Sequence, residues 1–531
     1  MAKRRWNNVP LALGVVAATS LAYNAHAQNE VPTLGGTAIF TLPQDPGGVN
    51  PDTTTNVPDR LLGCIFYQGL LHLSPDYKIL PLLAKTWSVS PDGLTYTFDL
   101  VDTQWSDGRP LGAEDVKYTL LEVSAKMSAS FASAGRAIDA IEAPTPSKVI
   151  IKLKQPFGPF LIALSCYTGG AILPSHLFRG TEPLKNPASL DKPVVTGPFT
   201  LTEWKRGDYV RLTKNPKYWE PGKPYLDEII AKVITAPAAR LQALRAGEVD
   251  IVQYLPASVE PAVHADPKLK VEVSAVAPQI SQAFLNVEHK PLNDKRVRQA
   301  LFMAIDREYL LKNVFFNVGT VATAPFTTKI TWAVNPDIDY TKMYPFNIAR
   351  ANALLDEAGV KRGAGGKRFT MRAVLFANQY TEFQQVATAI KGWWQQLGVD
   401  LIIETMEDAT LFKRVYVDRD FDLHMLSNSS LSDPAFGIGR TFVTSSIGKV
   451  YGNPEGYSNP EVDALFEKGE RATSYEERAP FYRQIQAILA EDLPVVQLRQ
   501  FIEIDGVSKK LHGIWGKSQG NGLWSEAWME K

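Results

Sequence analysis

The sequence predicts an α/β protein built from two or three lobes, and three observations support this fold class. The chain has 531 residues, which is too long for one simple core. Strand-like segments dominate its first half, whereas helical patterns dominate from about residue 285 onward. Between residues 369 and 426, strand and helix patterns alternate regularly, which is typical of a parallel sheet covered by helices.

The first 27 residues have the pattern of a cleavable secretory signal peptide. Lys3, Arg4 and Arg5 precede a short apolar run at 9–22, and alanines stand at the third and first positions before the predicted cut. The apolar run is shorter than the ~20 residues that a membrane-spanning helix needs. We therefore predict cleavage after Ala27 and a periplasmic mature protein that is not inserted in a membrane.

In the first half, residues 37–42, 94–100 and 148–154 have strand character. The segments GPFTLTEW and DYVRLTK, joined by the polar residues KRG, predict a hairpin. Residues 113–125 predict a helix, and its acidic first turn suits the helix dipole.

The second half predicts a βαβαβ lobe with a parallel core. Helices are expected at 294–305 and 347–359, the latter ending at Gly359. The core follows as strand 369–377, helix 381–398, strand 400–407, short helix 409–418 and strand 421–426. Two further helices, 459–472 and 475–491, precede the segment PVVQLRQFIEI, which predicts a strand that returns to the first lobe.

The polar segment LSNSSLSDPAFGIGR (426–440) follows the apolar strand FDLHML. Ligands of open parallel sheets bind beyond the carboxyl ends of the strands, and strand 369–377 ends at the same edge. The alternative is an ordinary surface connection. We predict that these strand ends face a ligand, with the candidates Asn378, Gln379, Asn428, Ser430, Asp433, Phe436 and Arg440.

Composition and motifs argue against several classes of function. Lys+Arg and Asp+Glu both number 56, so no basic field indicates a nucleic-acid partner. GKSQG matches a nucleophile elbow, but no histidine follows Ser518; SIGK (446–449) lacks its K-[ST]-G partner. The histidines are isolated, and no C-x-x-C, G-x-G-x-x-G or P-loop occurs. We therefore predict no enzyme activity, no catalytic residue, no metal site and no cofactor.

The two cysteines, Cys64 and Cys166, leave two alternatives open. They could pair in an oxidising compartment, but two buried free thiols fit the apolar segments around them equally well. His424, within the strand that leads into the polar segment, is predicted to be a hydrogen-bonded core histidine.

Aromatic residues add candidates near the C-terminus. Most tryptophans pack in cores or between lobes, but a few can line a concave pocket whose walls are flat and apolar. Trp515 and Trp524, with Asn521 between them, are therefore included as candidates for the ligand cleft.

Several segments together resemble one family, the periplasmic substrate-binding proteins of peptide- and nickel-type ABC transporters (extracellular solute-binding family 5). Residues 50–120 resemble its signature region almost continuously. Later blocks are similar as well: TGPFTLTEWKRGDYVRLTKNPKYW, RLQALRAGEVDIV, NDKRVRQALFMAIDREYLL and YSNPEVDALFEKG. The resemblance runs from about residue 35 to the C-terminus.

This resemblance implies an α/β, two-lobed periplasmic-binding-protein fold (type II, cluster C) with an extra subdomain in the first lobe, which closes on its ligand by hinge motion. The implied ranges are signal peptide 1–27, lobe I 28–60, inserted subdomain 61–195, lobe I continued 196–284, lobe II 285–500 and return to lobe I 501–531. Crossing strands near 275–285 and 495–505 are the expected hinges. The implied function is a monomeric solute receptor that captures a peptide or peptide-like solute between the lobes and delivers it to ABC permease subunits.

The chain departs from the family where dipeptide binders carry charge. Those relatives hold the peptide amine with an aspartate three residues before an Asp-Pro pair, a position that is Ser430 here. They hold the peptide carboxylate with an arginine after the strand 369–377, where this chain has Ala377. Asp433 and Arg440 could replace these partners from other positions.

The family's glutamate in a Y-E-G-L-like stretch is also replaced, by Gln68 in YQGL. Asn56, Tyr67 and Gln68 are the cleft candidates in this part of the first lobe. We predict a ligand that is less zwitterionic than a dipeptide, or one held by neutral hydrogen bonds and aromatic stacking. The alternative is a non-peptide solute, such as an opine, an oligosaccharide or a chelated metal.

Overall fold

The computed structural model describes residues 31–54, 56–74, 78–128, 130–273, 278–377, 382–431, 433–514 and 524–531. The predicted signal peptide lies outside these residues. Residues 33–531 form one compact unit, which is the part of the chain considered below. No helix among the described residues is both long enough and apolar enough to cross a membrane.

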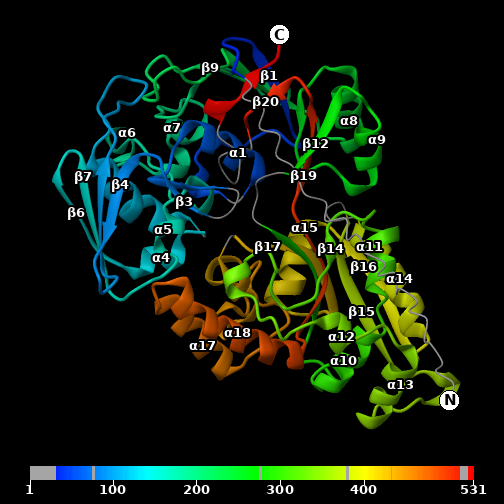
Figure 1. The fold of residues 1–531 in the computed structure, drawn as a ribbon. Coiled ribbons are helices and arrows are strands. Elements are labelled where there is room, and N and C mark those ends of the chain that lie inside the picture. The colour runs from blue at the N-terminus through cyan, green and yellow to red at the C-terminus, as the bar shows by residue number, and fades with distance from the viewer. Residues whose placement is uncertain are drawn as a thin grey trace, which may run out of the picture. The chain divides into compact units, whose positions relative to one another are not determined.

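The first large sheet has seven strands in the order β12-β19-β11-β1-β10-β9-β8 (Figure 1). β1 pairs in parallel with both β10 and β11, and β8 and β9 form the predicted antiparallel hairpin. The strands of this sheet are β1 (Thr37–Leu42), β8 (Phe199–Lys205), β9 (Tyr209–Lys214), β10 (Glu228–Val233), β11 (Ile251–Val252), β12 (Leu269–Val273) and β19 (Ile504–Ser508). The sheet therefore combines strands from both ends of the chain, with the late strand β19 inserted between β11 and β12.

The second large sheet has six strands in the order β14-β18-β13-β17-β15-β16. β15 pairs in parallel with β16 and with β17, which confirms the predicted parallel core. β13 pairs antiparallel with β17 and β18. The strands are β13 (Gln279–Leu285), β14 (Thr320–Val321), β15 (Phe369–Phe376), β16 (Val399–Met406), β17 (Leu423–Ser429) and β18 (Val495–Phe501).

Both faces of the second sheet are covered by helices. On β15, Met371 and Ala373 belong to a core shared with α10, α13 and α14, whereas Val374 and Phe376 belong to a core shared with α17 and α18. Successive side chains of a strand point to opposite faces, so a strand buried on both sides reads as an unbroken apolar run. This is why the sequence located these strands well.

A third sheet, of four antiparallel strands in the order β4-β5-β7-β6, lies within the range predicted for the inserted subdomain. Its strands are β4 (Ala84–Val89), β5 (Thr95–Leu100), β6 (Ile138–Thr145) and β7 (Lys148–Leu153). Two small hairpins are formed by β2 (Leu71–Leu73) with β3 (Ile79–Pro81), and by β20 (Leu511–His512) with β21 (Trp528–Met529).

The helices of the first part are α1 (Val57–Phe66), α2 (Ala113–Tyr118), α3 (Ala125–Met127), α4 (Ala132–Ala137), α5 (Phe160–Ala163), α6 (Ser175–Phe178), α7 (Pro187–Leu190), α8 (Pro237–Ala246) and α9 (Glu260–His264). The later helices are α10 (Lys295–Met303), α11 (Arg307–Asn313), α12 (Tyr340–Met343), α13 (Ile348–Glu357), α14 (Glu382–Gln395), α15 (Asp408–Phe412), α16 (Gly439–Phe442), α17 (Pro460–Arg471) and α18 (Tyr475–Asp492). The predicted helix 113–125 changes to a π-helical turn at Thr119, whose hydroxyl accepts a hydrogen bond from the backbone N–H of Leu173 at 3.0 Å.

The chain crosses between the two large sheets at two places among the described residues. β12 of the first sheet is followed by β13 of the second, and β18 of the second is followed by β19 of the first. Only Ile502 and Glu503 separate β18 from β19. These crossings fall where the hinge segments are predicted, near 275–285 and 495–505.

A disulfide joins Cys64 on α1 to Cys166, with 5.8 Å between their Cα atoms and a sequence separation of 102. This resolves the alternative that the sequence left open. His424 is wholly buried and its Nδ1–H donates to the Val374 carbonyl at 2.8 Å, as expected of a core histidine. Burial lowers the pKa of His424 to about 4, so the ring is neutral.

Candidate functional site

Three strands of the second sheet end or begin at the edge where the chain crosses to the first sheet. Gln279, the first residue of β13, is the register partner of Ser429 at the end of β17 and of Phe501 at the end of β18. This edge therefore contains the predicted strand-end segment and one of the crossings. A ligand bound here contacts the part of the molecule that a hinge motion moves.

The polar segment at this edge has more regular structure than the predicted connection. Residues 427–429 are the last part of β17, and residues 434–442 are helical, as the π-helical turn η9 (Pro434–Ile438) followed by α16. The Asp433 carboxylate caps η9 by accepting a hydrogen bond from the Ala435 N–H at 2.9 Å. Gly437 lies so close to Ser430 that a Cβ at Gly437 would stand 2.2 Å from the Ser430 carbonyl carbon. Gly437 is therefore a position of close packing, which an ordinary surface connection would not require.

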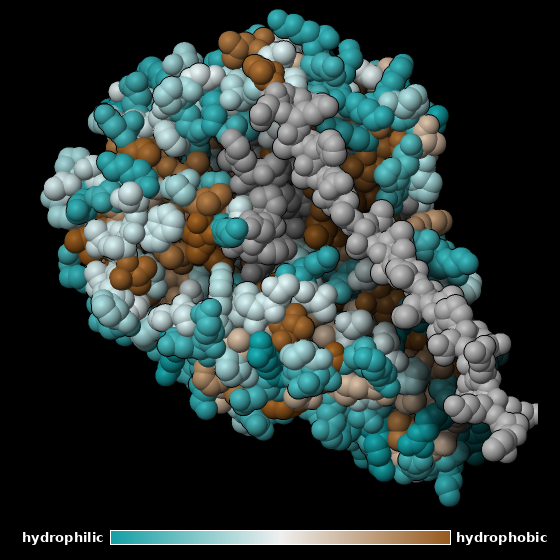
Figure 2. Space-filling view, in the orientation of Figure 1, coloured by the Kyte–Doolittle hydropathy of each residue, from teal (hydrophilic) through white to brown (hydrophobic). Residues whose placement is uncertain are grey.

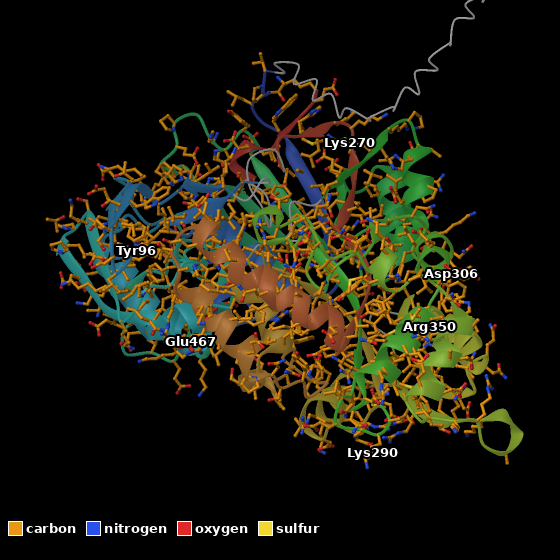
Figure 3. The ribbon with its side chains drawn as sticks, turned by 60° about the horizontal axis from the view of Figure 1, so that its bottom comes forward. Tyr96, Lys270, Lys290, Asp306, Arg350 and Glu467 are labelled. Carbon is orange, nitrogen blue, oxygen red and sulfur yellow. A yellow bond between two sulfur atoms is a disulfide. The ribbon has the colours of Figure 1, made fainter. Side chains whose placement is uncertain are left out.

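One cavity, which we call the subdomain cavity, lies between the inserted subdomain and the helices after β17, with a volume of about 650 Å³. Its walls are Ser130, Ser133, Arg136, Leu431, Ala435, Phe436, Gly439, Arg440, Val443, Thr444, Ser445, Ser446, Lys449, Asp463, Phe466, Glu467 and Glu470. Figure 3 labels Glu467 on α17. The predicted candidates Phe436 and Arg440 are thus brought together on one cavity wall.

The subdomain and the second lobe touch beside this cavity. The ring of Phe157 meets the ring of Phe436 edge-on at 6.0 Å between centroids, and the Gly158 N–H donates to the Glu470 carbonyl at 2.7 Å. Burial, reinforced by the negative charge of Asp433, raises the pKa of the Glu470 carboxyl to about 7. This contact brings the subdomain against the second lobe in the conformation described here.

A second cavity, which we call the hinge cavity, lies at the crossing from β18 to β19 and has a volume of about 420 Å³. Residues from both lobes form its walls: Tyr254, Leu255, Pro256, Ser258, Val314, Phe315, Phe316, Val318, Glu382, Gln385, Ser427, Arg499, Phe501, Ile502, Glu503 and Ile504. Ser427 and Asn428 point to opposite faces of β17. The hinge cavity is on the Ser427 face, and the Asn428 side chain bonds toward Arg440 and the subdomain cavity.

Arg499 is the buried cation of the hinge cavity, with 5% of its surface exposed. Its guanidinium lies 3.9 Å from the ring centre of Phe315 and 4.0 Å from that of Phe501. Its Nε donates to Ser281 Oγ and its Nη1 to the Val318 carbonyl, both at 3.1 Å. Burial lowers the pKa of Arg499 to about 10, so the guanidinium stays charged at neutral pH.

Glu503 and Tyr254 form the side of the hinge cavity nearest the first lobe. Burial raises the pKa of Glu503 to about 7; the nearby Arg499 opposes this shift and Glu382 adds to it. Tyr254 has a left-handed backbone, with φ of 53°, and its N–H donates to the buried carboxylate of Asp505 at 3.0 Å. A non-glycine residue held in this region is often found at a functional site.

Arg60 and Tyr167 lie in the first lobe, where the charge of Glu503 acts on Tyr167. The Arg60 guanidinium lies 4.7 Å from the ring centre of Tyr167. Burial raises the pKa of Tyr167, the charge of Arg60 opposes that shift, and the charge of Glu503 adds to it. Both residues neighbour the disulfide: Arg60 stands one helical turn before Cys64, and Tyr167 follows Cys166.

Two predicted candidates at the strand end, Asn428 and Ser430, are nearly buried. Asn428 donates to Gln282 Oε1 at 2.8 Å and accepts from Arg440 Nη2 at 3.4 Å. Ser430 has 1% of its surface exposed, and among the described residues its Oγ has no hydrogen-bond partner. A buried hydroxyl without a partner can accept or donate one hydrogen bond to an added group.

Asp433 has a structural role that its sequence context did not reveal. Its carboxylate is wholly buried and forms two hydrogen bonds of 2.7 Å with the guanidinium of Arg478, which is itself 1% exposed. Arg478 also donates to the Gly469 carbonyl at 2.8 Å and to Tyr482 Oη at 3.0 Å. The Asp433 charge is therefore already paired within the protein, which argues against its predicted role of holding a ligand amine.

The candidates of the first lobe lie mainly in its interior. Tyr67 is wholly buried and its Oη donates to the Ala188 carbonyl at 2.7 Å, which places it in the core and away from a ligand. Gln68, 5% exposed, accepts from Trp219 Nε1 at 3.1 Å. Asn56 precedes α1, half-buried, and accepts from Gln44 Nε2 at 2.9 Å. Trp524 is 4% exposed and packs against Phe40 with 5.2 Å between ring centroids.

Four further candidates, Asn378, Gln379, Trp515 and Asn521, lie outside the described residues. Sequence reasoning missed Arg60, Tyr167, Tyr254, Glu382, Arg499 and Glu503. One signal was available: Arg499 and Glu503 are the two charged residues of PVVQLRQFIEI, the strand predicted to return to the first lobe, and charges are seldom buried unless they are paired. Among the described residues, no group of three or more metal-ligating side chains is found.

In Figure 2, hydrophobic side chains form several separate patches on the face shown, and hydrophilic side chains cover most of its periphery. Apolar walls with a few placed charges are the usual composition of a site for a small ligand.

Comparison with known proteins identifies the family. A model described as "Bacterial extracellular solute-binding proteins, family 5 Middle" matches residues 78–449. The glutathione-binding protein GsiB of Escherichia coli K12 is 28% identical over 517 residues, which cover 95% of each chain. The oligopeptide-binding protein AppA of Bacillus subtilis, solved with a nonapeptide, has a TM-score of 0.79 and 26% identity, covering 94% of this chain and 100% of that one.

NikZ of Campylobacter jejuni, solved in complex with Ni(L-His), has the same fold. Its TM-score is 0.77 at 24% identity, over 92% of this chain and 97% of that one. The two-lobed α/β fold agrees with these matches. The chain belongs to the bacterial extracellular solute-binding proteins of family 5.

Proposed function

We propose that this protein is the solute receptor of an ABC importer and that it captures a peptide or a peptide-like small solute between its lobes. The observation that carries the proposal is the hinge cavity, whose walls come from both lobes and whose charges lie beside a chain crossing. Closure of the lobes encloses a ligand there, and a membrane permease can then distinguish the closed form from the open one. Relatives that bind glutathione and a nonapeptide support this class of ligand.

The proposal includes no catalytic step, because a receptor needs only to bind and release. It also includes export, cleavage after Ala27 and a monomeric mature protein in the periplasm. Intact-mass measurement of the secreted protein tests the cleavage site, and light scattering tests the monomer. A mass that retains residues 1–27 contradicts the first, and a dimer mass contradicts the second.

The experiment that tests the function is extraction of protein purified without denaturation from its native source. Unfolding in denaturant releases any retained solute, and mass spectrometry identifies it. A ladder of peptide masses, or a single small peptide such as glutathione, supports the proposal. The same protein, refolded without ligand, then serves to measure affinity for the recovered solute.

A non-peptide solute is the second candidate, and one observation favours it. The two positions at which dipeptide binders carry an aspartate and an arginine are Ser430 and Ala377 here, and Asp433 is already paired with Arg478. An opine, an oligosaccharide or a chelated metal needs neither charge at those positions. A single released mass that contains no peptide bond would establish this alternative in place of the first.

A further inference from the structure

The hinge cavity contains two carboxylates that no other described residue neutralises directly. Glu382 stands in the first turn of α14, and Glu503 lies between β18 and β19. Among the described residues, neither side chain accepts a hydrogen bond or forms an ion pair. Buried or half-buried carboxylates are usually paired, so two such groups on one cavity wall point to a missing partner.

Arg499 does not supply that partner in full. Its Nε and Nη1 are used within the second lobe, by Ser281 Oγ and the Val318 carbonyl, and two aromatic rings flank its guanidinium. Its charge lowers the pKa of Glu503 but does not offset the effect of burial. Among the wall residues, two ionised carboxylates face one guanidinium, so the walls have an excess of one negative charge. Arg60, which stacks on Tyr167, is not a wall residue and is not among the groups that shift the pKa of Glu503.

We propose that the hinge cavity is the subsite for an ammonium group of the transported solute, held between Glu382 and Glu503. This inference rests on the proposed function and names the charge class of the ligand. An ammonium group has three donors and one charge, which match two carboxylates and the single excess negative charge. A cavity of about 420 Å³ has room for the ammonium group and the adjoining part of a short peptide.

A divalent metal ion fits this cavity poorly. Calcium and magnesium take six or more oxygen ligands, whereas the cavity presents two carboxylates beside a fixed guanidinium. The guanidinium also repels a metal ion, which has no hydrogen bonds to offer in exchange. The organic ammonium is therefore the occupant that the geometry favours.

The position of this subsite explains how the chain can recognise an amine although Ser430 is neutral. The negative charge has moved from the segment after β17 to the chain crossing. Because Glu503 belongs to the crossing itself, an ammonium bound there neutralises charge where the two lobes meet. Binding and closure are then coupled through the same contact.

Protonation of Glu503 gives the proposal a second, independent readout. Arg499, Glu382, Tyr254 and Tyr167 are the charged and titratable groups that act with Glu503. With its pKa raised to about 7, Glu503 is partly protonated in the empty protein at neutral pH, whereas a bound ammonium requires the carboxylate. Binding below about pH 7 therefore releases protons from Glu503, and affinity rises from pH 6 to about pH 7.5. Above that pH, the peptide α-amine, whose pKa is about 7.7–8.0, loses its own proton, so affinity falls again.

The test compares two probe mixtures: tri- to pentapeptides lacking Lys and Arg, and the same peptides after N-acetylation. Equilibrium dialysis with mass spectrometry measures retention by the ligand-free wild type and by Glu382→Gln, Glu503→Gln and the control Glu461→Gln. Glu461 is exposed in the first turn of α17, far from the cavity walls. We expect the wild type to prefer free amines by about tenfold or more, and each cavity variant to lose most of this preference. The control should keep it.

Equal retention of both mixtures, unchanged in the variants, overturns the inference and leaves the proposed function in place. Retention of neither mixture by the wild type removes peptides as the solute class, and the inference falls with it. If Glu503→Gln does not fold, Glu382→Gln carries the same comparison. Calorimetry in two buffers of different ionisation enthalpy checks proton release, which should be lost in Glu503→Gln; no release by the wild type contradicts the proposal.

Discussion

The Asp433–Arg478 pair offers a sharp test of whether the polar segment 426–440 binds ligand or supports the fold. Replacing Asp433 with Asn leaves the guanidinium of Arg478 buried and charged, with one of its two 2.7 Å carboxylate contacts changed to a donor facing a donor. Arg478 keeps its bonds to Gly469 and Tyr482, but these are neutral acceptors. We expect Asp433→Asn to reduce stability strongly and ligand affinity of the folded protein only weakly.

The magnitude follows from burial. Removing one partner of a fully buried ion pair costs about 3–5 kcal/mol. For a cooperative unit of 150–250 residues, that loss lowers Tm by roughly 6–20 °C. The double variant Asp433→Leu/Arg478→Met removes both charges and should recover much of the lost stability, because no unpaired charge remains in the interior.

Differential scanning calorimetry measures the Tm values, and binding of the recovered solute is measured well below the transition. A matched control is Glu357→Gln, which breaks the exposed ion pair with Arg350, labelled in Figure 3. This control should leave Tm unchanged within error. An Asp433→Asn protein with unaltered Tm and abolished binding would refute the structural role argued above and return Asp433 to the ligand site.

Three further predictions test other parts of the structure. Burial raises the pKa of Asp52 from 3.8 to about 7, so its stabilising contribution is present below pH 4 and is lost as pH rises through 7. Asp52→Asn should therefore gain about 4 kcal/mol of stability relative to wild type between pH 4 and pH 8. Thermal unfolding of both proteins across this pH range measures the difference. A pH-independent difference between the two proteins would contradict this. The variant Cys64→Ser/Cys166→Ser should lose roughly 2–5 kcal/mol of stability, because the disulfide closes a loop of 102 residues. It should also bind the solute more weakly, because the disulfide helps to hold Arg60 and Tyr167 in place. An unchanged affinity would show that the disulfide has no part in positioning these two residues. Gly437→Ala should displace Ser430 and lower both Tm and ligand affinity. The control Gly392→Ala, whose added Cβ has no atom within 4 Å, should lower neither. Equal behaviour of the two variants would contradict the close packing of Gly437 against Ser430.

Much of the second lobe could be predicted from sequence, and the reason is physical. The apolar runs of β15 and β17 and the helical pattern of α14 are local signals, and local signals determine strands, helices and their parallel arrangement. The polar segment 426–440, for which an ordinary surface connection was the alternative, is a different case. Its Pro434 and Gly437 are typical turn residues, but a helical turn capped by Asp433 and packed against Ser430 uses the same residues for close contact.

The site was harder to predict because its contacts are distant in sequence. Asp433 meets Arg478 after 45 residues, and Tyr67 donates to Ala188 after 121 residues. No local pattern announces such partners. Glu503 was visible as a charge in the segment predicted to cross between the lobes, but only the fold shows which residues of both lobes form a cavity beside it. The sequence therefore showed the Glu503 charge but not its place in the hinge cavity.

The insertion of β19 between β11 and β12 has a consequence for assembly. Until residues 504–508 are available, the first sheet lacks the strand that joins β12 to the others, whereas residues 279–501 already contain every strand of the second sheet. During synthesis the second lobe can therefore become ordered early, while the first waits for nearly the last segment of the chain. A chain that ends before residue 504 therefore contains all the strands of the second sheet but cannot complete the first.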